Sequence, residues 1–261
     1  MKKIGIGIIG LGNIGSRLYK EIISKKKDIG LKTNTSINIV AISAKNIHKK
    51  RSFKIKRKIF FKRPLDITKN PKVNIVIELI GKESGISKKI VENSLKNKKH
   101  VITANKALIS KHGDHLSSIA EKNKVNLEFE ASVCGGVPII RSLKEGLIAN
   151  KISKIYGIFN GTSNYILSSM DKENKNFKDV LSNAKKLGYA EANPSADLNG
   201  DDVSSKLKIL TSLCFNSFLN KNVHVEGIKN IDKKDIDNAN KLGYKIKLLG
   251  FAESINNKIY Q

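Results

Sequence analysis

The sequence of 261 residues contains no tryptophan, only four prolines and only two cysteines. Cys134 and Cys214 are too few and too far apart for a disulfide framework or a zinc site. No run of about 18 apolar residues occurs, so we expect no membrane-spanning helix. Glycines interrupt the apolar stretch of residues 4–11, which argues against a signal peptide. These absences predict a protein of the reducing cytoplasm.

Acidic residues are scarce as well, with 23 Asp and Glu against 49 Lys and Arg, a formal net charge of +26. Such a charge favours nucleic-acid binding when the cations cluster on one surface. Here the lysines are spread along nearly every segment, and the densest stretch, residues 45–63, contains few aromatic residues that could stack on bases. We interpret the charge as a general drift in composition and predict no nucleic-acid partner.

Hydrophobic patterning divides the chain into two parts. Strands are expected at residues 3–9, 37–43, 73–80, 100–103 and 126–130, with helices at 14–24, 87–97 and 113–124 and a polar linker at 25–36. Strands that alternate with helices, without hairpin turns, predict a doubly wound parallel sheet. The later pattern predicts helices at 139–146, 165–171, 177–187 and 202–215 and a strand at 152–159. We therefore expect an α/β protein with domains at residues 1–133 and 134–261.

A glycine-rich loop follows the first expected strand and opens the first expected helix. It reads Gly10-Leu11-Gly12-Asn13-Ile14-Gly15. In such a loop the first glycine permits a tight turn, the second lets the backbone approach a pyrophosphate, and the third allows close helix packing. Gly10, Gly12, Asn13, Ile14 and Gly15 are therefore predicted to bind a dinucleotide, and a turn without a ligand is the alternative.

The end of the second expected strand should decide which dinucleotide binds. NAD sites commonly place an Asp or Glu there to bind the ribose. This chain instead has Lys45, followed by His48, Lys49, Lys50 and Arg51. Cations at this place suit a 2′-phosphate, so NADP is favoured. NAD stays possible, because these lysines also fit the general drift in composition.

Four further segments carry a resemblance to a known family. They are residues 103–108 (TANKAL), 160–167 (NGTSNYIL), 188–194 (GYAEANP) and 196–206, which contains Asp197, Asp202 and Lys206. With the glycine loop they resemble homoserine dehydrogenase, in the same order along the chain. The resemblance implies an N-terminal Rossmann-like domain, an α+β catalytic and dimerisation domain, and a homodimer. It also implies NAD(P)-dependent interconversion of L-homoserine and L-aspartate 4-semialdehyde, in threonine, methionine and isoleucine biosynthesis.

The resemblance also implies roles for single residues. Lys206 matches the general acid/base, Asp202 the group that binds the substrate hydroxyl or orients Lys206, and Lys106 a residue that reaches both cofactor and substrate. Substrate-binding positions are Glu191, Thr162, Tyr189 and Asp197, with Glu191 facing the substrate ammonium. Glu130, Val133, Gly135 and Val137 match a site for a monovalent cation such as Na⁺. Without these motifs, Asp202 and Lys206 would suggest only an exposed i,i+4 ion pair.

The sequence also departs from the family pattern. Residues 81–85 (GKESG) replace the usual two glycines and a proline, and the chain ends at Gln261, before segments that family members continue through. The resemblance therefore suggests a shortened enzyme or a fragment, and an inactive or regulatory dinucleotide-binding module is the alternative. Aldehyde dehydrogenation through a cysteine would need a paired Cys and His, for which the sequence gives no indication.

Overall fold

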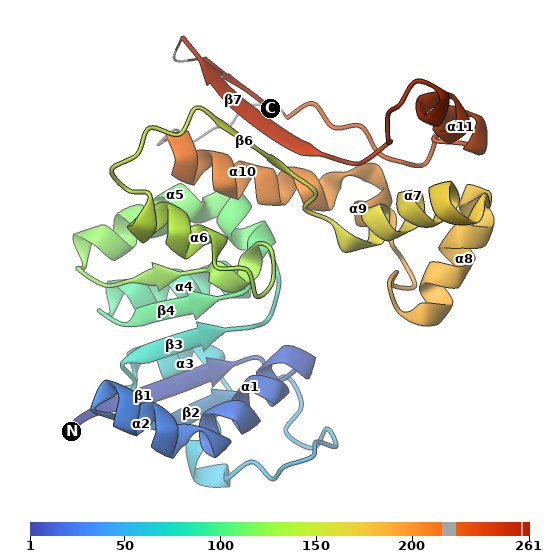
Figure 1. The fold of residues 1–261 in the computed structure, drawn as a ribbon. Helices are drawn as coiled ribbons and strands as arrows, with labels where there is room; N and C mark the ends of the chain where they lie inside the picture. Colours follow the sequence, from blue (N-terminus) through green and yellow to red (C-terminus); the bar gives the residue numbers. More distant parts are fainter. Residues whose placement is uncertain (216–222, 257) are drawn as a thin grey trace. The chain divides into compact units, whose positions relative to one another are not determined.

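The structure is a computed structural model that describes residues 1–215, 223–256 and 258–261. The chain forms two compact units, residues 1–139 and 140–261, each with its own sheet (Figure 1). Among the described residues, no helix combines the length and the apolar character needed to cross a membrane.

The first unit contains a five-stranded parallel sheet in the order β2-β1-β3-β4-β5. Its strands are β1 (Lys2–Ile9), β2 (Thr35–Ser43), β3 (Ile75–Glu78), β4 (His100–Thr103) and β5 (Leu127–Glu128). Its helices are α1 (Asn13–Ser24), α2 (Lys26–Thr33), α3 (Pro64–Lys69), α4 (Ile86–Lys96) and α5 (Lys106–Lys122), with short 3₁₀ turns η1 (Arg57–Ile59) and η2 (Glu130–Ser132). Figure 1 shows α1 and α2 on one face of the sheet and α3 and α4 on the other. The predicted doubly wound fold is confirmed.

The strand order explains where a ligand can enter this unit. The chain leaves β1 toward β2 in one direction and continues from β3 toward β4 in the other. Right-handed crossovers then place the connecting helices on opposite faces, so the loops after β1 and β3 diverge at the carboxyl edge of the sheet. The core below this edge is aliphatic, with Ile8 and Ile42 fully buried and Tyr19 stacked on Phe53 at 4.3 Å between ring centroids.

Helices α2 and α3 of this unit are not predicted from the sequence, and α5 begins earlier than predicted. The expected polar linker contains α2, whose only buried residue is Gly30, so there was no apolar periodicity to reveal it. Helix α5 begins at Lys106 rather than near residue 113, because the Asn105 side chain accepts a hydrogen bond from the Leu108 N–H at 3.1 Å and caps the helix.

The second unit is α+β, as predicted. Strands β6 (Lys154–Gly157), β7 (Gly250–Ile255) and β8 (Lys258–Tyr260) form an antiparallel sheet in that order. Its helices are α6 (Ile139–Arg141), which continues into a π-helical turn η3 (Ser142–Gly146), α7 (Gly161–Glu173), α8 (Phe177–Leu187), α9 (Ser195–Asn199), α10 (Asp201–Phe215) and α11 (Lys233–Lys241). An apolar cluster that includes Ile166, Met170 and Ile236 joins α7, α8, α9 and α11.

The three glycines of the β1–α1 connection have different roles. Gly10 has a φ of 103°, and a Cβ on Gly10 would lie 2.6 Å from the Leu79 carbonyl oxygen. A Cβ on Gly15 would lie 2.0 Å from the Gly10 carbonyl oxygen, whereas one on Gly12 would meet nothing within 4 Å. Gly10 and Gly15 are therefore required by packing, and Gly12 leaves the surface of the loop open.

We predict that Gly15→Ala lowers the free energy of unfolding by about 1 to 3 kcal/mol, because the added methyl group forces α1 away from the loop. Gly12→Ala is the matched control, and we expect it to cost less than about 1 kcal/mol. Thermal or urea unfolding of the two variants measures the difference. Equal stability of both variants would contradict the packing argument.

Candidate functional site

A cavity of about 850 Å³ lies at the carboxyl edge of the parallel sheet, within the first unit. It is lined by the glycine loop after β1, by the segment after β2 and by the loop after β3, including Gly10, Gly12, Ser43, Lys45, Leu79, Ile80 and Lys82. Helix α1 begins at Asn13, directly after the open Gly12, so its first N–H groups and positive dipole end face the loop. The cavity therefore suits an elongated anionic ligand such as a dinucleotide.

The segment after β2 supplies positive charge to this cavity. Lys45, His48, Lys49 and Lys62 line it, and all four are exposed. Arg51, predicted as one more cation for a phosphate, instead supports its own loop. Its guanidinium donates hydrogen bonds to the carbonyls of Asn46 at 2.9 Å, Ile47 at 3.2 Å and Lys49 at 3.0 Å. Lys45 is therefore the stronger candidate to contact a ligand phosphate.

Lys106, the other predicted residue of this unit, opens α5 directly after β4. Because the strands are parallel, Lys106 lies at the same carboxyl edge of the sheet as the glycine loop.

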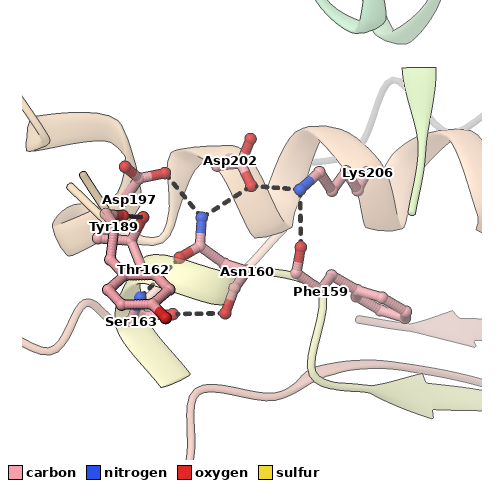
Figure 2. A network of polar contacts seen from close by, with 8 residues as sticks. All are labelled: Phe159, Asn160, Thr162, Ser163, Tyr189, Asp197, Asp202 and Lys206. Carbon is pink, nitrogen blue, oxygen red and sulfur yellow. Dashed lines mark hydrogen bonds and ion pairs between the residues drawn. The ribbon is translucent and has the colours of Figure 1, made fainter. Parts of the chain in front are cut away.

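A second group of polar residues lies within the second unit, around the start of α10 (Figure 2). Lys206 Nζ lies 2.7 Å from Asp202 Oδ2 and donates a hydrogen bond to the Phe159 carbonyl oxygen at 2.7 Å. The side chains of Lys206 and Asp202 are only 18% and 8% exposed. The pair is therefore not the exposed surface ion pair that its i,i+4 spacing alone suggests.

Asn160 connects this ion pair to a second carboxylate. Its Nδ2 donates to Asp197 Oδ1 at 2.7 Å and to Asp202 Oδ2 at 3.0 Å, and its Oδ1 accepts the Ser163 N–H at 2.7 Å. Asn160 is buried and caps α7. Residues 160–167 are part of the resemblance, which implies no role for Asn160 itself. An Asn directly before a helical pattern is a capping signal that could have identified it.

Thr162 and Tyr189, two predicted substrate-site residues, contact each other at the edge of this group. Thr162 Oγ1 donates to the Tyr189 carbonyl oxygen at 2.7 Å. The Tyr189 ring stacks on Tyr165 with centroids 4.4 Å apart, which fixes the loop after α8 against α7. Glu191 follows in that loop, exposed to solvent and outside the network of Figure 2. The structure thus brings together five of the six predicted residues of this unit and leaves Glu191 apart.

The predicted monovalent-cation residues lie in a tight bend at the end of the first unit. Glu130 opens η2, Val133 is buried, Val137 is exposed, and Cys134 and Gly135 have φ values of 55° and 59°. Among the described residues, no group of three or more His, Cys, Asp or Glu side chains could hold a metal ion. A site built from backbone carbonyls stays a prediction.

The Cys214 thiol lacks the lowered pKa of an activated nucleophile. Burial raises the pKa of the Cys214 thiol to about 11, so this thiol stays protonated at neutral pH. Cys134 is half-buried. The protonated Cys214 thiol gives no support to a mechanism through a cysteine adduct.

Comparison with known proteins agrees with this geometry. Residues 10–130 match the family model for the NAD-binding domain of homoserine dehydrogenase, and residues 138–260 match the homoserine dehydrogenase model. The chain is 41% identical to the homoserine dehydrogenase of Neisseria gonorrhoeae, covering 96% of this chain and 57% of that one, and 38% identical to that of Bacillus subtilis, covering 99% and 60%. The chain thus spans little more than half the length of these relatives.

Solved structures give the same result. The homoserine dehydrogenase of Thiobacillus denitrificans superposes with a TM-score of 0.91 at 38% identity, covering 99% of this chain and 60% of that one. The enzyme of S. aureus at pH 6.0 superposes with a TM-score of 0.87 at 40% identity, covering 99% and 65%. Both likenesses span both units of the fold.

We predict that Asn160→Asp lowers the free energy of unfolding by about 2 to 4 kcal/mol. The new carboxylate keeps the cap acceptor for Ser163 but replaces two donated hydrogen bonds by repulsion from Asp197 and Asp202. Asn176→Asp is the matched control, since Asn176 caps α8 and donates to Asp179 at an exposed position. We expect the control to cost less than about 1 kcal/mol. Similar losses in urea unfolding would contradict the bridging role of Asn160.

Proposed function

The chain belongs to the homoserine dehydrogenase family, and on that premise we propose that it interconverts L-homoserine and L-aspartate 4-semialdehyde with a nicotinamide dinucleotide. Residues 1–133 form the cofactor domain and residues 134–261 the catalytic domain of this proposal. The reaction serves threonine, methionine and isoleucine biosynthesis. The observation that carries the proposal is the Lys206 ammonium, held at low exposure by Asp202 and the Phe159 carbonyl.

The reaction needs a proton carrier at the substrate oxygen. When bound, the nicotinamide supplies or accepts the hydride, and the chain orients the substrate and moves the proton. Lys206 donates that proton in the reduction and takes it back in the oxidation. Asp202, hydrogen-bonded by Asn160 and paired with Lys206, binds the substrate hydroxyl and fixes the direction of the ammonium.

The remaining predicted residues of the second unit surround this proton carrier. Asp197 shares the Asn160 amide with Asp202, and the contact between Thr162 and Tyr189 shapes the adjoining loop. Glu191 is exposed in the same loop and offers a carboxylate to the substrate ammonium. In the first unit, Lys106 lies at the carboxyl edge of the sheet and serves both cofactor and substrate.

The cofactor of this proposal is NADP, with NAD as the second choice. The residues present fit such a group, because the open Gly12 and the start of α1 suit the pyrophosphate and Lys45 lines the same cavity where a 2′-phosphate would lie. Gly10, Asn13, Ile14 and Gly15 complete the loop that holds the pyrophosphate.

A monovalent cation and a second copy of the chain complete the proposal. The bend that contains Glu130, Val133, Gly135 and Val137 offers a carboxylate and backbone carbonyls, which are the hard oxygen ligands that Na⁺ accepts. Exposed aromatic side chains on the antiparallel sheet, including Tyr156 and Tyr260, favour a homodimer. Their exposed fractions are 68% and 53%.

Reduction of L-aspartate 4-semialdehyde by NADPH, followed by the loss of reduced-nicotinamide absorbance, tests the proposed reaction. We expect Lys206→Ala to lower kcat by roughly 10²- to 10⁴-fold and to leave NADPH binding within about twofold. Lys208→Ala is the control, because it removes a lysine from the same helix on a different face. Turnover of Lys206→Ala within a few-fold of the unchanged chain would transfer the proton step to Lys106. NADPH binding without turnover by the unchanged chain would favour a dinucleotide-binding module.

The cofactor preference has a separate test. We expect Lys45→Glu to weaken NADPH binding by about tenfold and to leave NADH binding nearly unchanged, because a charge-assisted contact with the 2′-phosphate becomes a repulsion. Lys27→Glu changes the net charge equally, on α2. Fluorescence titrations with the two cofactors measure the effect. Equal affinity of the unchanged chain for NADPH and NADH would contradict this preference.

A further inference from the structure

One acidic side chain of the first unit is completely buried at the carboxyl edge of the sheet. Glu78 is the last residue of β3 and has 0% exposure. Its Oε1 accepts the Ile80 N–H at 2.9 Å, and its Oε2 accepts the Thr103 hydroxyl at 2.8 Å. Both donors are neutral, so hydrogen bonds rather than an ion pair hold this carboxylate. A buried carboxylate that loses a hydrogen bond lowers the stability of the fold. Glu78 therefore holds its two donors, the Ile80 N–H and the Thr103 hydroxyl, in place.

The Thr103 hydroxyl extends this contact to the next strand and helix. Thr103 ends β4, and its Oγ1 also accepts the Asn105 N–H at 3.1 Å. The Asn105 side chain in turn accepts the Leu108 N–H and donates to the Lys82 carbonyl oxygen at 2.7 Å. The hydrogen bonds therefore run from the end of β3, through the end of β4 and the start of α5, to residues 79–85.

Residues 79–85, here called the β3–α4 loop, form one wall of the dinucleotide cavity through Leu79, Ile80 and Lys82. This loop is held at three places. Glu78 binds the Ile80 N–H, Asn105 binds the Lys82 carbonyl, and Lys111 of α5 lies 2.8 Å from Glu83 Oε1. Gly81 and Gly85 have positive φ values of 82° and 66°, which residues with a side chain rarely adopt. The backbone of the loop is therefore strongly bent between the three contacts.

The place of the loop indicates which part of the ligand it receives. A dinucleotide in a doubly wound fold lies across the strand-order reversal, with its pyrophosphate on the glycine loop. In that orientation a 2′-phosphate would lie beside β2, where Lys45 lines the cavity, and the nicotinamide half would lie toward β3 and β4. The β3–α4 loop is on this second side.

We propose that Glu78, Thr103 and Asn105 are positioning residues, which hold the β3–α4 loop so that the cavity receives the nicotinamide half of the cofactor. This inference rests on the proposed dinucleotide binding. It assigns a role to the loop at the point where the sequence departs from the family pattern. There Asn105, the cap of α5, donates to the Lys82 backbone carbonyl, and Lys111 of α5 pairs with Glu83.

Thr103 offers the sharpest substitution. Thr103→Val keeps the shape of the side chain but leaves the Glu78 carboxylate and the Asn105 N–H each without one partner. Thr103→Ser keeps the hydroxyl and should restore the network. Glu78→Gln is the second variant, because its amide oxygen can still accept the Ile80 N–H while the Thr103 hydroxyl proton loses its carboxylate acceptor.

The experiment compares two ligands on the full 261-residue chain. NADPH contains both halves of the dinucleotide, whereas 2′-phosphoadenosine 5′-diphosphoribose contains the 2′-phosphate and pyrophosphate but lacks nicotinamide. We expect Thr103→Val to weaken NADPH binding by about tenfold and to leave binding of the second ligand within about twofold. Thr103→Ser should bind both ligands within about threefold of the unchanged chain. Thermal unfolding establishes that each variant is folded, and Glu78→Gln replaces Thr103→Val if the latter is not.

The outcomes separate this inference from the proposed function. Equal weakening of both ligands would assign the network a purely structural role and overturn the inference, as would unchanged NADPH binding by folded Thr103→Val and Glu78→Gln. In either case the proposed cofactor binding still stands. If the unchanged chain binds neither ligand, the proposed cofactor binding fails and the inference fails with it.

Discussion

The second unit depends on how Asn160 bridges two carboxylates, the half-buried Asp197 and the buried Asp202. One amide caps α7 and donates to Asp197 of α9 and Asp202 of α10, so the starts of three helices meet at a single side chain. Two carboxylates that contact the same nitrogen would repel each other without that donor between them. The Lys206 ammonium offsets the charge of Asp202, and the Phe159 carbonyl oxygen accepts a hydrogen bond from it. The arrangement that stabilises the helix junction therefore also presents a charged amine at a fixed position.

In the first unit, fixed contacts shape the cavity at the carboxyl edge of the sheet. Parallel strands end there with their loops pointing the same way, and a ligand can enter only where the loops after β1 and β3 diverge. Close packing at Gly10 and Gly15 brings α1 up to the sheet, and Glu78 fixes the loop on the other side. The wall formed by the glycine loop thus depends on glycines that lack a Cβ, and the wall formed by the β3–α4 loop depends on the buried Glu78 carboxylate.

Hydrophobic periodicity was sufficient for the elements that have a clear apolar face. β4 and α8 begin and end at the predicted residues, because each is bounded by residues that end the pattern. Helix α2 was missed, since it buries only one glycine, and the start of α5 was missed because its capping residue lies far from its apolar stretch. The site motifs predict Asp202 and Lys206 on one helix face, and in the structure their side chains are paired at 2.7 Å. The sequence could have identified Asn160 as the cap of α7. Its bridge to Asp197 and the contact between Glu78 and Thr103 could not be assigned, because they join residues 37 and 25 positions apart in the chain.

In this chain, acidic residues are more informative about candidate sites than basic residues. With 49 lysines and arginines, the presence of a lysine at any one position says little, and most of those named here are exposed. The 23 acidic residues are scarce enough for their burial to be informative. Among the described residues, the buried acidic residues are Glu78 at 0% and Asp202 at 7% exposure, one in each unit. Keeping a carboxylate out of water requires every partner to be in place, so each of these two acids forces its neighbours into one arrangement. In a strongly basic chain, a buried acid is therefore a more specific marker of a candidate site than any one of the abundant lysines.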